Sequence, residues 1–221
     1  MTESSFVCPV NSEIPVDVFI SRKRLGLSTR GDLLFTDASG NIVFRVDDHY
    51  HHQSSKSRKQ VVHHLLDAQG NTLINISRND CIDPSLAAAT TAAASGSIQT
   101  LCHSSSTVGW QGCRGDSREC KDLIFKVKKS TLQSFLRKDL EVLLFGEYCG
   151  EPCPGLKIRG STFHRSCTIY QGNSIIAQTS LLYKLHTVTI RRRRFRLTIF
   201  PGLFDHALLV ALIVIFFNGS I

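Results

Sequence analysis

Residues 207–217 read Ala-Leu-Leu-Val-Ala-Leu-Ile-Val-Ile-Phe-Phe, and every one of them is apolar. A helix built from this stretch has no face suited to water. At about 1.5 Å per residue such a helix is roughly 16 Å long, whereas a bilayer core is about 30 Å thick and requires about 20 apolar residues. The stretch therefore predicts a helix enclosed on all sides by protein, and a β-barrel is the natural enclosure.

A membrane tail anchor is the alternative interpretation, because a hydrophobic C-terminal segment has that general appearance. Extension of the helix toward the N-terminus meets His206, Asp205 and the Pro201-Gly202 pair, none of which suits hydrocarbon. The enclosed helix is the interpretation that we favour, and it requires the rest of the chain to form strands.

Strand–turn–strand patterns support that requirement. Asp-Ala-Ser-Gly-Asn at 37–41 and Asp-Ala-Gln-Gly-Asn at 67–71 each separate two apolar segments, and Gln-Gly-Asn at 171–173 is a weaker third copy. Gly and Asn adopt the positive φ of tight hairpin turns, so each unit predicts a β-hairpin. Further strands are indicated by alternating or apolar runs at 16–20, 123–127, 140–145, 156–159, 163–170 and 195–199. With the helix confined to the C-terminus, the pattern predicts a mainly β protein, an antiparallel barrel or sandwich.

Length and composition predict one domain over residues 15–221, preceded by a loose tail at 1–14. Residues 83–107 are dominated by Ala, Ser and Thr, do not alternate, and are interpreted as a flexible insertion. The net charge of +8 favours anionic partners, either lipid headgroups or nucleic acid. Solubility alone accounts equally well for that charge.

The first residues have no apolar signal segment, so we expect an intracellular protein that is not secreted. Its eight cysteines are then expected to be reduced thiols. Their spacings are not those of paired metal knuckles, and the histidines His49, His51 and His52 in 47–59 are interpreted as part of a solvated loop. We therefore expect no metal and no cofactor.

Four blocks resemble the LURP-one-related family of plants, whose fold belongs with the tubby C-terminal domain and the phospholipid scramblases. The blocks are 32–46, 114–123, 160–170 and 205–215. The resemblance extends from about residue 15 to residue 215, interrupted by the Ala/Ser-rich segment. It implies a twelve-stranded antiparallel barrel closed around a hydrophobic C-terminal helix.

The sequence departs from the family pattern at 80–107, where a short basic connection is usual, so we expect one strand pair to be weakened or missing. The composition of 181–194 is also unfamiliar. The helix ends in Phe216-Phe217-Asn218, where an acidic residue is usual.

Several motifs are interpreted as structural. Arg114-Gly115-Asp116 spells an integrin ligand, but within the family pattern it belongs to a turn before a strand. Cys167 with His164 and His103 could be written as a nucleophile with its base, yet no third group that would orient them is evident. We expect no catalytic residues and no small-molecule substrate.

The resemblance and the charge together predict a non-enzymatic protein that binds anionic phospholipid headgroups, phosphoinositides included, through basic strand faces. It would lie in the cytoplasm or peripherally on the inner face of the plasma membrane. The candidate lipid-binding residues are Arg22, Lys23, Arg24, Lys126, Lys128 and Lys129. In the strand after Asp122, apolar residues are expected to face the helix, which turns the three lysines outward.

A nuclear, transcription-linked or plant defence-related protein with a protein or nucleic-acid partner is the alternative. Its candidate nuclear-targeting residues are Arg191, Arg192, Arg193 and Arg194, although a charged loop before a strand looks the same. Phospholipid scrambling is a third hypothesis, and the weakest, because the apolar helix is expected to be buried.

Overall fold

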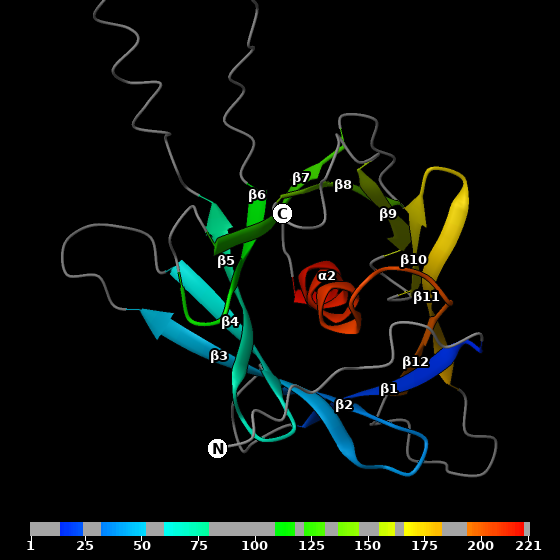
Figure 1. Ribbon diagram of the computed structural model, residues 1–221, viewed down its shortest axis with the longest axis horizontal. Coiled ribbons are helices and arrows are strands. Elements are labelled where there is room, and N and C mark those ends of the chain that lie inside the picture. Colours follow the sequence, from blue (N-terminus) through cyan, green and yellow to red (C-terminus); the bar gives the residue numbers. More distant parts are fainter. Residues whose placement is uncertain are drawn as a thin grey trace, which may run out of the picture.

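The computed structural model describes residues 14–23, 32–51, 60–79, 109–117, 122–130, 137–145, 155–161, 166–182 and 194–218. This part of the chain forms a closed barrel of twelve strands with one helix inside it (Figure 1). Each strand pairs antiparallel with its neighbours in the sequence, and β1 closes the barrel by pairing with β12. The predicted mainly β fold, a twelve-stranded antiparallel barrel around a C-terminal helix, is therefore confirmed.

The strands alternate in direction around the wall. Their bounds are β1 Val16–Lys23, β2 Asp32–Thr36, β3 Ile42–His51, β4 Gln60–Asp67, β5 Thr72–Asn79, β6 Gly109–Arg114, β7 Leu123–Lys129, β8 Lys138–Leu144, β9 Leu156–Ser161, β10 Ser166–Gln171, β11 Ser174–Leu182 and β12 Arg194–Ile199.

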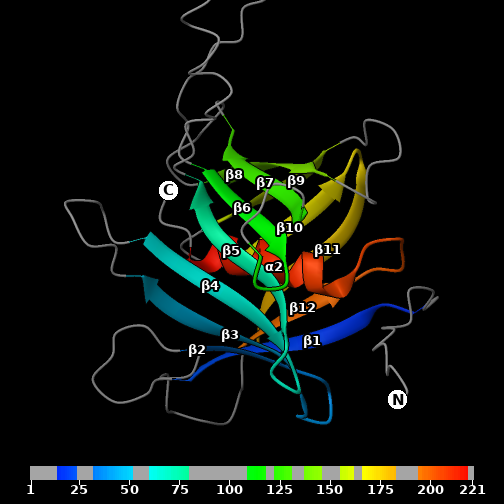
Figure 2. The same cartoon turned by 60° about the vertical axis from the view of Figure 1, so that its left-hand side comes forward.

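The helix α2 (His206–Asn218) runs through the barrel and is enclosed by the strands (Figure 2). Ten consecutive residues, from Ala207 to Phe216, are buried. Asp205 caps the first turn, since its Oδ1 accepts a hydrogen bond from the backbone N of Ala207 at 3.0 Å. Side chains from β1, β7, β9 and β12 pack into the same core as the helix. In the part of the chain that is described, no helix has both the length and the apolar character needed to cross a membrane.

The three predicted hairpins are present as β2–β3, β4–β5 and β10–β11. Asp37 and Asp67 organise the first two turns in the same way, because a carboxylate oxygen of each accepts a hydrogen bond at 2.8 Å from the backbone N of Asn41 or Asn71. Gly40 and Gly70 have φ of 90° and 97°, the left-handed region that the turn requires. The Arg114-Gly115-Asp116 sequence forms the end of β6 and the turn that follows it, as predicted.

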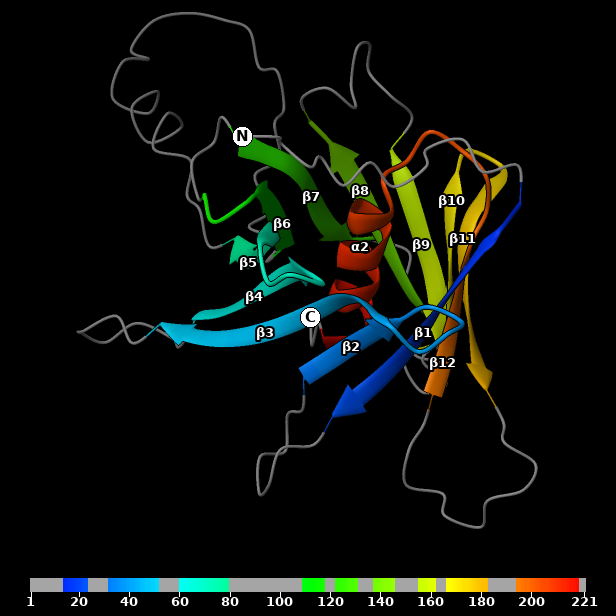
Figure 3. The same cartoon turned by 60° about the horizontal axis from the view of Figure 1, so that its bottom comes forward.

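The two ends of the barrel differ in what they carry. We call the end at which α2 begins the entry end, and the end at which α2 finishes the exit end (Figure 3). Odd-numbered strands run toward the exit end and even-numbered strands run back, because all neighbours are antiparallel. The three hairpin turns therefore lie at the entry end. The last residues of β1, β5 and β7 and the first residues of β8 and β12 lie at the exit end.

Two predictions about the loops are wrong. Residues 42–51 form β3, so residues 47–51, with His49 and His51, belong to a strand and not to a solvated loop. The strand pair around the Ala/Ser-rich segment is neither weakened nor missing, because β5 and β6 pair from Ile74 with Arg114 to Asn79 with Gly109. Residues 1–13, His52 and the segment 83–107 lie outside the described residues.

Candidate functional site

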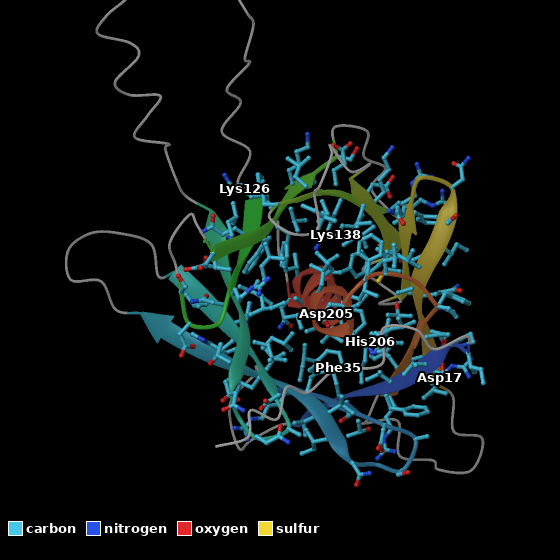
Figure 4. All side chains as sticks on the ribbon, in the orientation of Figure 1. Asp17, Phe35, Lys126, Lys138, Asp205 and His206 are labelled. Atoms are coloured by element: carbon cyan, nitrogen blue, oxygen red, sulfur yellow. The ribbon has the colours of Figure 1, made fainter. Side chains whose placement is uncertain are left out.

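The outer face of β7, β8 and β9 carries alternating cations and anions. Lys128 Nζ lies 3.2 Å from the Oε2 atom of Glu141 on β8. Glu141 also lies opposite Lys157 of β9 in the register, so one carboxylate stands between two lysines. Lys126 Nζ lies 5.8 Å from the centre of the Phe145 ring. Figure 4 shows Lys126 on the outside of the wall.

A second row on this face pairs Arg159 of β9 with Asp139 of β8. The Arg159 guanidinium lies 5.9 Å from the centre of the Tyr170 ring on β10. Lys126, Lys128, Lys157 and Arg159 are thus four cations against the two carboxylates of this face. The positive excess is two charges. We call these four cations the outer basic face.

The other basic residues predicted from the sequence lie elsewhere on the barrel. Arg22 and Lys23 are the last residues of β1, and Arg194 is the exposed first residue of β12. Because β1 pairs with β12, the lipid-binding candidates Arg22 and Lys23 and the nuclear-targeting candidate Arg194 lie at the same exit end of the barrel. In the ring of strands, however, β7 is six positions from β1, so the outer basic face is not continuous with them. Arg24 and the three arginines Arg191, Arg192 and Arg193 lie outside the described residues.

Lys129 does not belong to the outer basic face. In the register of β7 with β8 it lies opposite Leu140, which is 1 % exposed and faces the core. Residues directly opposite each other in an antiparallel pair share a face. The prediction that all three lysines turn outward is therefore wrong for Lys129, which continues the inward series of Phe125 and Val127.

A polar layer that the sequence did not reveal lines the inside of the wall at the exit end. The buried ring of His63 stacks on Trp110 at 5.4 Å between centres, and its Nδ1 lies 2.5 Å from Asp48 Oδ1. The Arg78 guanidinium lies 5.4 Å from the centre of the Trp110 ring. Arg78 and Trp110 are opposite each other in β5 and β6. The layer thus joins residues from four consecutive strands.

Lys138, the first residue of β8, is buried on the same side of the wall. Its Nζ donates a hydrogen bond to the backbone carbonyl oxygen of Phe216 at 3.4 Å. The same Nζ lies 5.3 Å from the centre of the Phe216 aromatic ring. Figure 4 shows Lys138 on the side of the wall that faces α2. Burial lowers the pKa of the Lys138 ammonium to about 8, and the positive charges of Lys129 and Arg78 act in the same direction.

The alternation of the strands was the signal that could have found this layer. In β5, Ile74 and Ile76 face the core and Arg78 follows at the same period of two. In β7 the same continuation leads from Val127 to Lys129. A strand assignment that ends at Ile76 or Val127 misses the cation two residues later, Arg78 or Lys129, which lies on the same inner face.

Cys167 is unsuited to act as a nucleophile. Burial raises the pKa of its thiol to about 12, and its backbone N donates a hydrogen bond at 2.8 Å to the Thr179 hydroxyl oxygen. His164 and His103 lie outside the described residues. Among the residues that are described, no three His, Cys, Asp or Glu side chains are grouped so as to hold a metal ion.

Known proteins resemble this chain over the whole length of the barrel. The sequence model of the LURP-one-related family matches residues 16–217, from the first strand to the end of the helix. The chain belongs to the LURP-one-related family. It is 39 % identical over 206 residues to Protein LURP-one-related 7 of Arabidopsis thaliana, covering 93 % of this chain and 91 % of that protein.

Two further relatives from Arabidopsis thaliana match nearly the same length of this LURP-one-related chain. Protein LURP-one-related 15 is 28 % identical over 203 residues, which cover 91 % of this chain and 78 % of the relative. Protein LURP-one-related 10 is 27 % identical over 203 residues, which cover 91 % of this chain and 88 % of the relative. The residues matched by the family model, 16–217, include both the outer basic face and the polar layer inside the wall.

Proposed function

We propose that this LURP-one-related protein is a non-enzymatic protein that binds anionic phospholipid headgroups, phosphoinositides included, through its outer basic face. The observation that carries the proposal is the excess of cations on β7, β8 and β9, where Glu141 stands between Lys128 and Lys157. Near an anionic leaflet each cation contributes about 1 kcal/mol. A positive excess of this size supports reversible, peripheral attachment.

The remaining features agree with a binding role. The high pKa of Cys167 opposes nucleophilic catalysis at the one cysteine that resembled a nucleophile. A relationship to tubby-like domains and to phospholipid scramblases, implied by the sequence blocks, also favours contact with lipid. Scrambling itself is disfavoured, because the apolar residues of α2 are buried in the barrel and are not available to a bilayer.

A nuclear, transcription-linked or defence-related role is the second candidate. Arg194 and Arg196 are both exposed on β12, and Arg196 Nη1 lies 3.6 Å from Asp17 Oδ2. These arginines continue the run that begins at Arg191. The partition of the tagged protein between nucleus and plasma membrane separates this role from lipid attachment.

Flotation with phosphoinositide-containing liposomes tests the lipid proposal. The double variant Lys126→Glu/Lys128→Glu should float less than wild type while remaining folded, with a melting temperature lowered only slightly by the loss of the Lys128–Glu141 pair, because both side chains lie on the outside of the wall. Attachment of the wild type should weaken as salt shortens the Debye length from about 10 Å to about 3 Å.

Matched variants separate a local effect from net charge. Lys126→Gln/Lys128→Gln and Ser174→Glu/Gln178→Glu each lower the net charge by two, and the second pair changes exposed positions of β11. The proposal expects only the first pair to reduce flotation. Equal flotation of wild type and Lys126→Glu/Lys128→Glu at low salt would contradict it, and the arginine run would then be the better candidate.

A further inference from the structure

Exposed apolar side chains gather at the entry end of the barrel. Five large apolar side chains are exposed in the described part of the chain, and Leu203 and Ile14 are the most exposed, at 84 % and 74 %. Ile14 precedes β1, Ile175 is the second residue of β11, and Leu203 lies between β12 and α2. All three therefore lie at the entry end. We call these three residues the apolar rim.

The register brings two members of the apolar rim to the two sides of β12. Val16 of β1 and Ala177 of β11 both lie opposite Ile199 of β12. Ile14 and Ile175 each lie two residues farther toward the entry end. Because neighbouring strands are about 4.8 Å apart, the backbones of Ile14 and Ile175 are separated by roughly 10 Å.

The linker from β12 to α2 adds Leu203 to the same place. The backbone N of Phe200 donates a hydrogen bond to the carbonyl oxygen of Ile176 at 3.0 Å, so the linker begins alongside β11. Pro201 is exposed next to it. Figures 2 and 3 show the linker, in orange, at the side of the barrel where β1 begins. Single exposed apolar residues are ordinary, but a group of them indicates a contact surface.

The other two exposed apolar side chains, Ile42 and Leu143, do not belong to this group. Thr36 lies opposite both Ile42 and Phe19, and Phe19 is five residues along β1 from Ile14. Leu143 lies on β8, three strands from β11. It is 46 % exposed, close to the 44 % of Ile175, and it therefore offers a matched control.

The entry end is acidic, although the chain as a whole carries a net charge of +8. Among the described residues that lie in a turn or linker at this end, or within two residues of a strand end there, carboxylates outnumber cations. The carboxylates are Asp17, Asp37, Asp67, Asp116, Asp122 and Asp205, and the cations are Arg114 and Lys157. Six carboxylates against two cations leave an excess of four negative charges.

Two neighbouring residues change this excess little. Arg196 lies one residue farther from the entry end, with its Nη1 3.6 Å from Asp17 Oδ2, and counting it leaves an excess of three. Burial lowers the pKa of His206 below its ordinary value of 6.5, so this side chain adds no positive charge at neutral pH. An anionic membrane is therefore disfavoured at the entry end, because like charges repel.

We infer that the apolar rim is a docking site for a cationic amphipathic segment of a partner protein, in which apolar side chains stand between lysines or arginines. The apolar side chains of such a segment cover the rim, and its cations complement the acidic end and guide the approach. This inference goes beyond the proposed attachment to lipid and does not rest on it. The outer basic face on the wall and the rim at the entry end are separate surfaces.

A synthetic helical peptide tests the inference. It carries leucines at positions i, i+3, i+4 and i+7 and lysines on both sides of them, and its binding to the full chain is followed by fluorescence anisotropy of a label. The expected result is saturable binding that weakens as salt increases. Two matched peptides, with every lysine replaced by glutamate or every leucine by glutamine, should not bind.

Variants of the full chain locate the binding. Leu203→Ser and Ile175→Ser should each weaken it about tenfold, whereas Leu143→Ser should change it by less than about twofold. Melting temperatures verify that each variant is folded. Asp205→Asn tests the charge, because asparagine caps a helix as well as aspartate does. It should weaken binding about threefold at low salt and less at high salt.

Several outcomes would overturn the inference: no saturable binding by wild type, equal binding of the glutamate peptide, or equal effects of Leu143→Ser and Leu203→Ser. A wild-type dimer in sedimentation that Leu203→Ser dissociates would assign the rim to a second copy of the chain instead. Reduced flotation of Leu203→Ser with phosphatidylcholine vesicles, at unchanged peptide affinity, would assign it to a membrane. Lys126→Glu/Lys128→Glu should keep the peptide binding, so failure of the rim and failure of the outer basic face are distinguishable.

Discussion

Lys138 Nζ donates a hydrogen bond to the carbonyl oxygen of Phe216 and thereby joins the start of β8 to the last turn of α2. The last carbonyl groups of a helix have no partner within the helix, and the C-terminal end of the helix dipole favours a cation. A buried lysine at this position satisfies both requirements.

The lowered pKa of Lys138 predicts how stability depends on pH. The folded pKa is about 8, against the ordinary lysine pKa of 10.5, so between these two pH values the unfolded chain binds more protons than the folded protein. Stability should therefore rise as pH increases through this window, by about 1–3 kcal/mol. The penalty of burying the charge is fully present below pH 8.

Denaturant unfolding of wild type and Lys138→Met at several pH values between 7 and 10.5 measures this effect. The variant carries no ionisable group at this position, so its stability should rise less over the same window. Other titrating groups contribute equally to both proteins and cancel in the difference. Parallel curves would show that Lys138 does not carry the pH dependence.

Leu212 tests the role of the helix as the core of the barrel. Its side chain is fully buried in the middle of α2. Burial of each such side chain contributes up to about 1.5–3 kcal/mol, and an unpaired carboxylate at the same place costs several kcal/mol more. Leu212→Asp should yield insoluble protein, as judged by the soluble fraction after expression. A chain truncated after Pro201 that remained soluble and unfolded cooperatively would contradict this role.

The helix and the hairpins could be predicted because their signals are local. Residues 207–217 are apolar on every side and too short to span a bilayer, which favours an enclosed helix, and each Asp-x-x-Gly-Asn turn encodes its own conformation. The inward direction of Lys129 was also available from the alternation of Phe125 and Val127, and the register with Leu140 on another strand confirms it. Closure between β1 and β12 depends on residues about 180 positions apart, such as Asp17 and Thr198.

The polar layer inside the wall was missed for a related reason. Asp48, His63, Arg78 and Trp110 lie on four different strands, and the interval of 32 residues from Arg78 to Trp110 does not repeat the interval of 15 between the others. A local pattern shows that a strand alternates, but it does not show which polar residues meet in the interior. Only the register of β3, β4, β5 and β6 brings these four together.

The turn of β4–β5 supplies a second pH-dependent prediction. Asp67 Oδ1 accepts hydrogen bonds from Gly70 N at 2.7 Å and Asn71 N at 2.8 Å. Partial burial raises the pKa of this carboxyl, but these hydrogen bonds and that of the Asn71 side chain outweigh it and lower the pKa below 3.8. The lowered folded pKa contributes stability above the unfolded value, and this contribution is lost as pH falls through the folded value.

Asp67→Asn removes the ionisation and should cost roughly 1 kcal/mol at neutral pH, the net contribution of one or two hydrogen bonds. Urea unfolding should show that wild type loses more stability than the variant between pH 5 and pH 3. Asp37→Asn, in the matching turn of β2–β3, should behave in the same direction because hydrogen bonds from Asn41 lower the pKa of Asp37. Identical acid profiles of wild type and both variants would show that the turn carboxylates do not set the pH dependence.

The last prediction concerns the connection between β5 and β6, whose segment 83–107 has the composition of an unpacked chain. Asn79 and Gly109 lie opposite each other in the register, so a short connection can join the two strand ends. Ordering a residue costs about 1–2 kcal/mol of backbone entropy, which small polar and alanine side chains do not offset. Each halving of loop length instead gains about 0.6 kcal/mol.

Replacement of 83–107 by a short Gly/Ser linker should therefore leave the melting temperature unchanged or slightly raised, as measured by calorimetry. Limited proteolysis of the unaltered chain should cut within this segment first, and the replaced variant should lose those cuts while keeping the rest. As a control, Ile76→Asp puts a charge on the buried face of β5 and should lower the melting temperature strongly, because Ile76 is fully buried. A loss of several degrees on replacement of the segment would mean that 83–107 packs against the barrel and contributes to its stability.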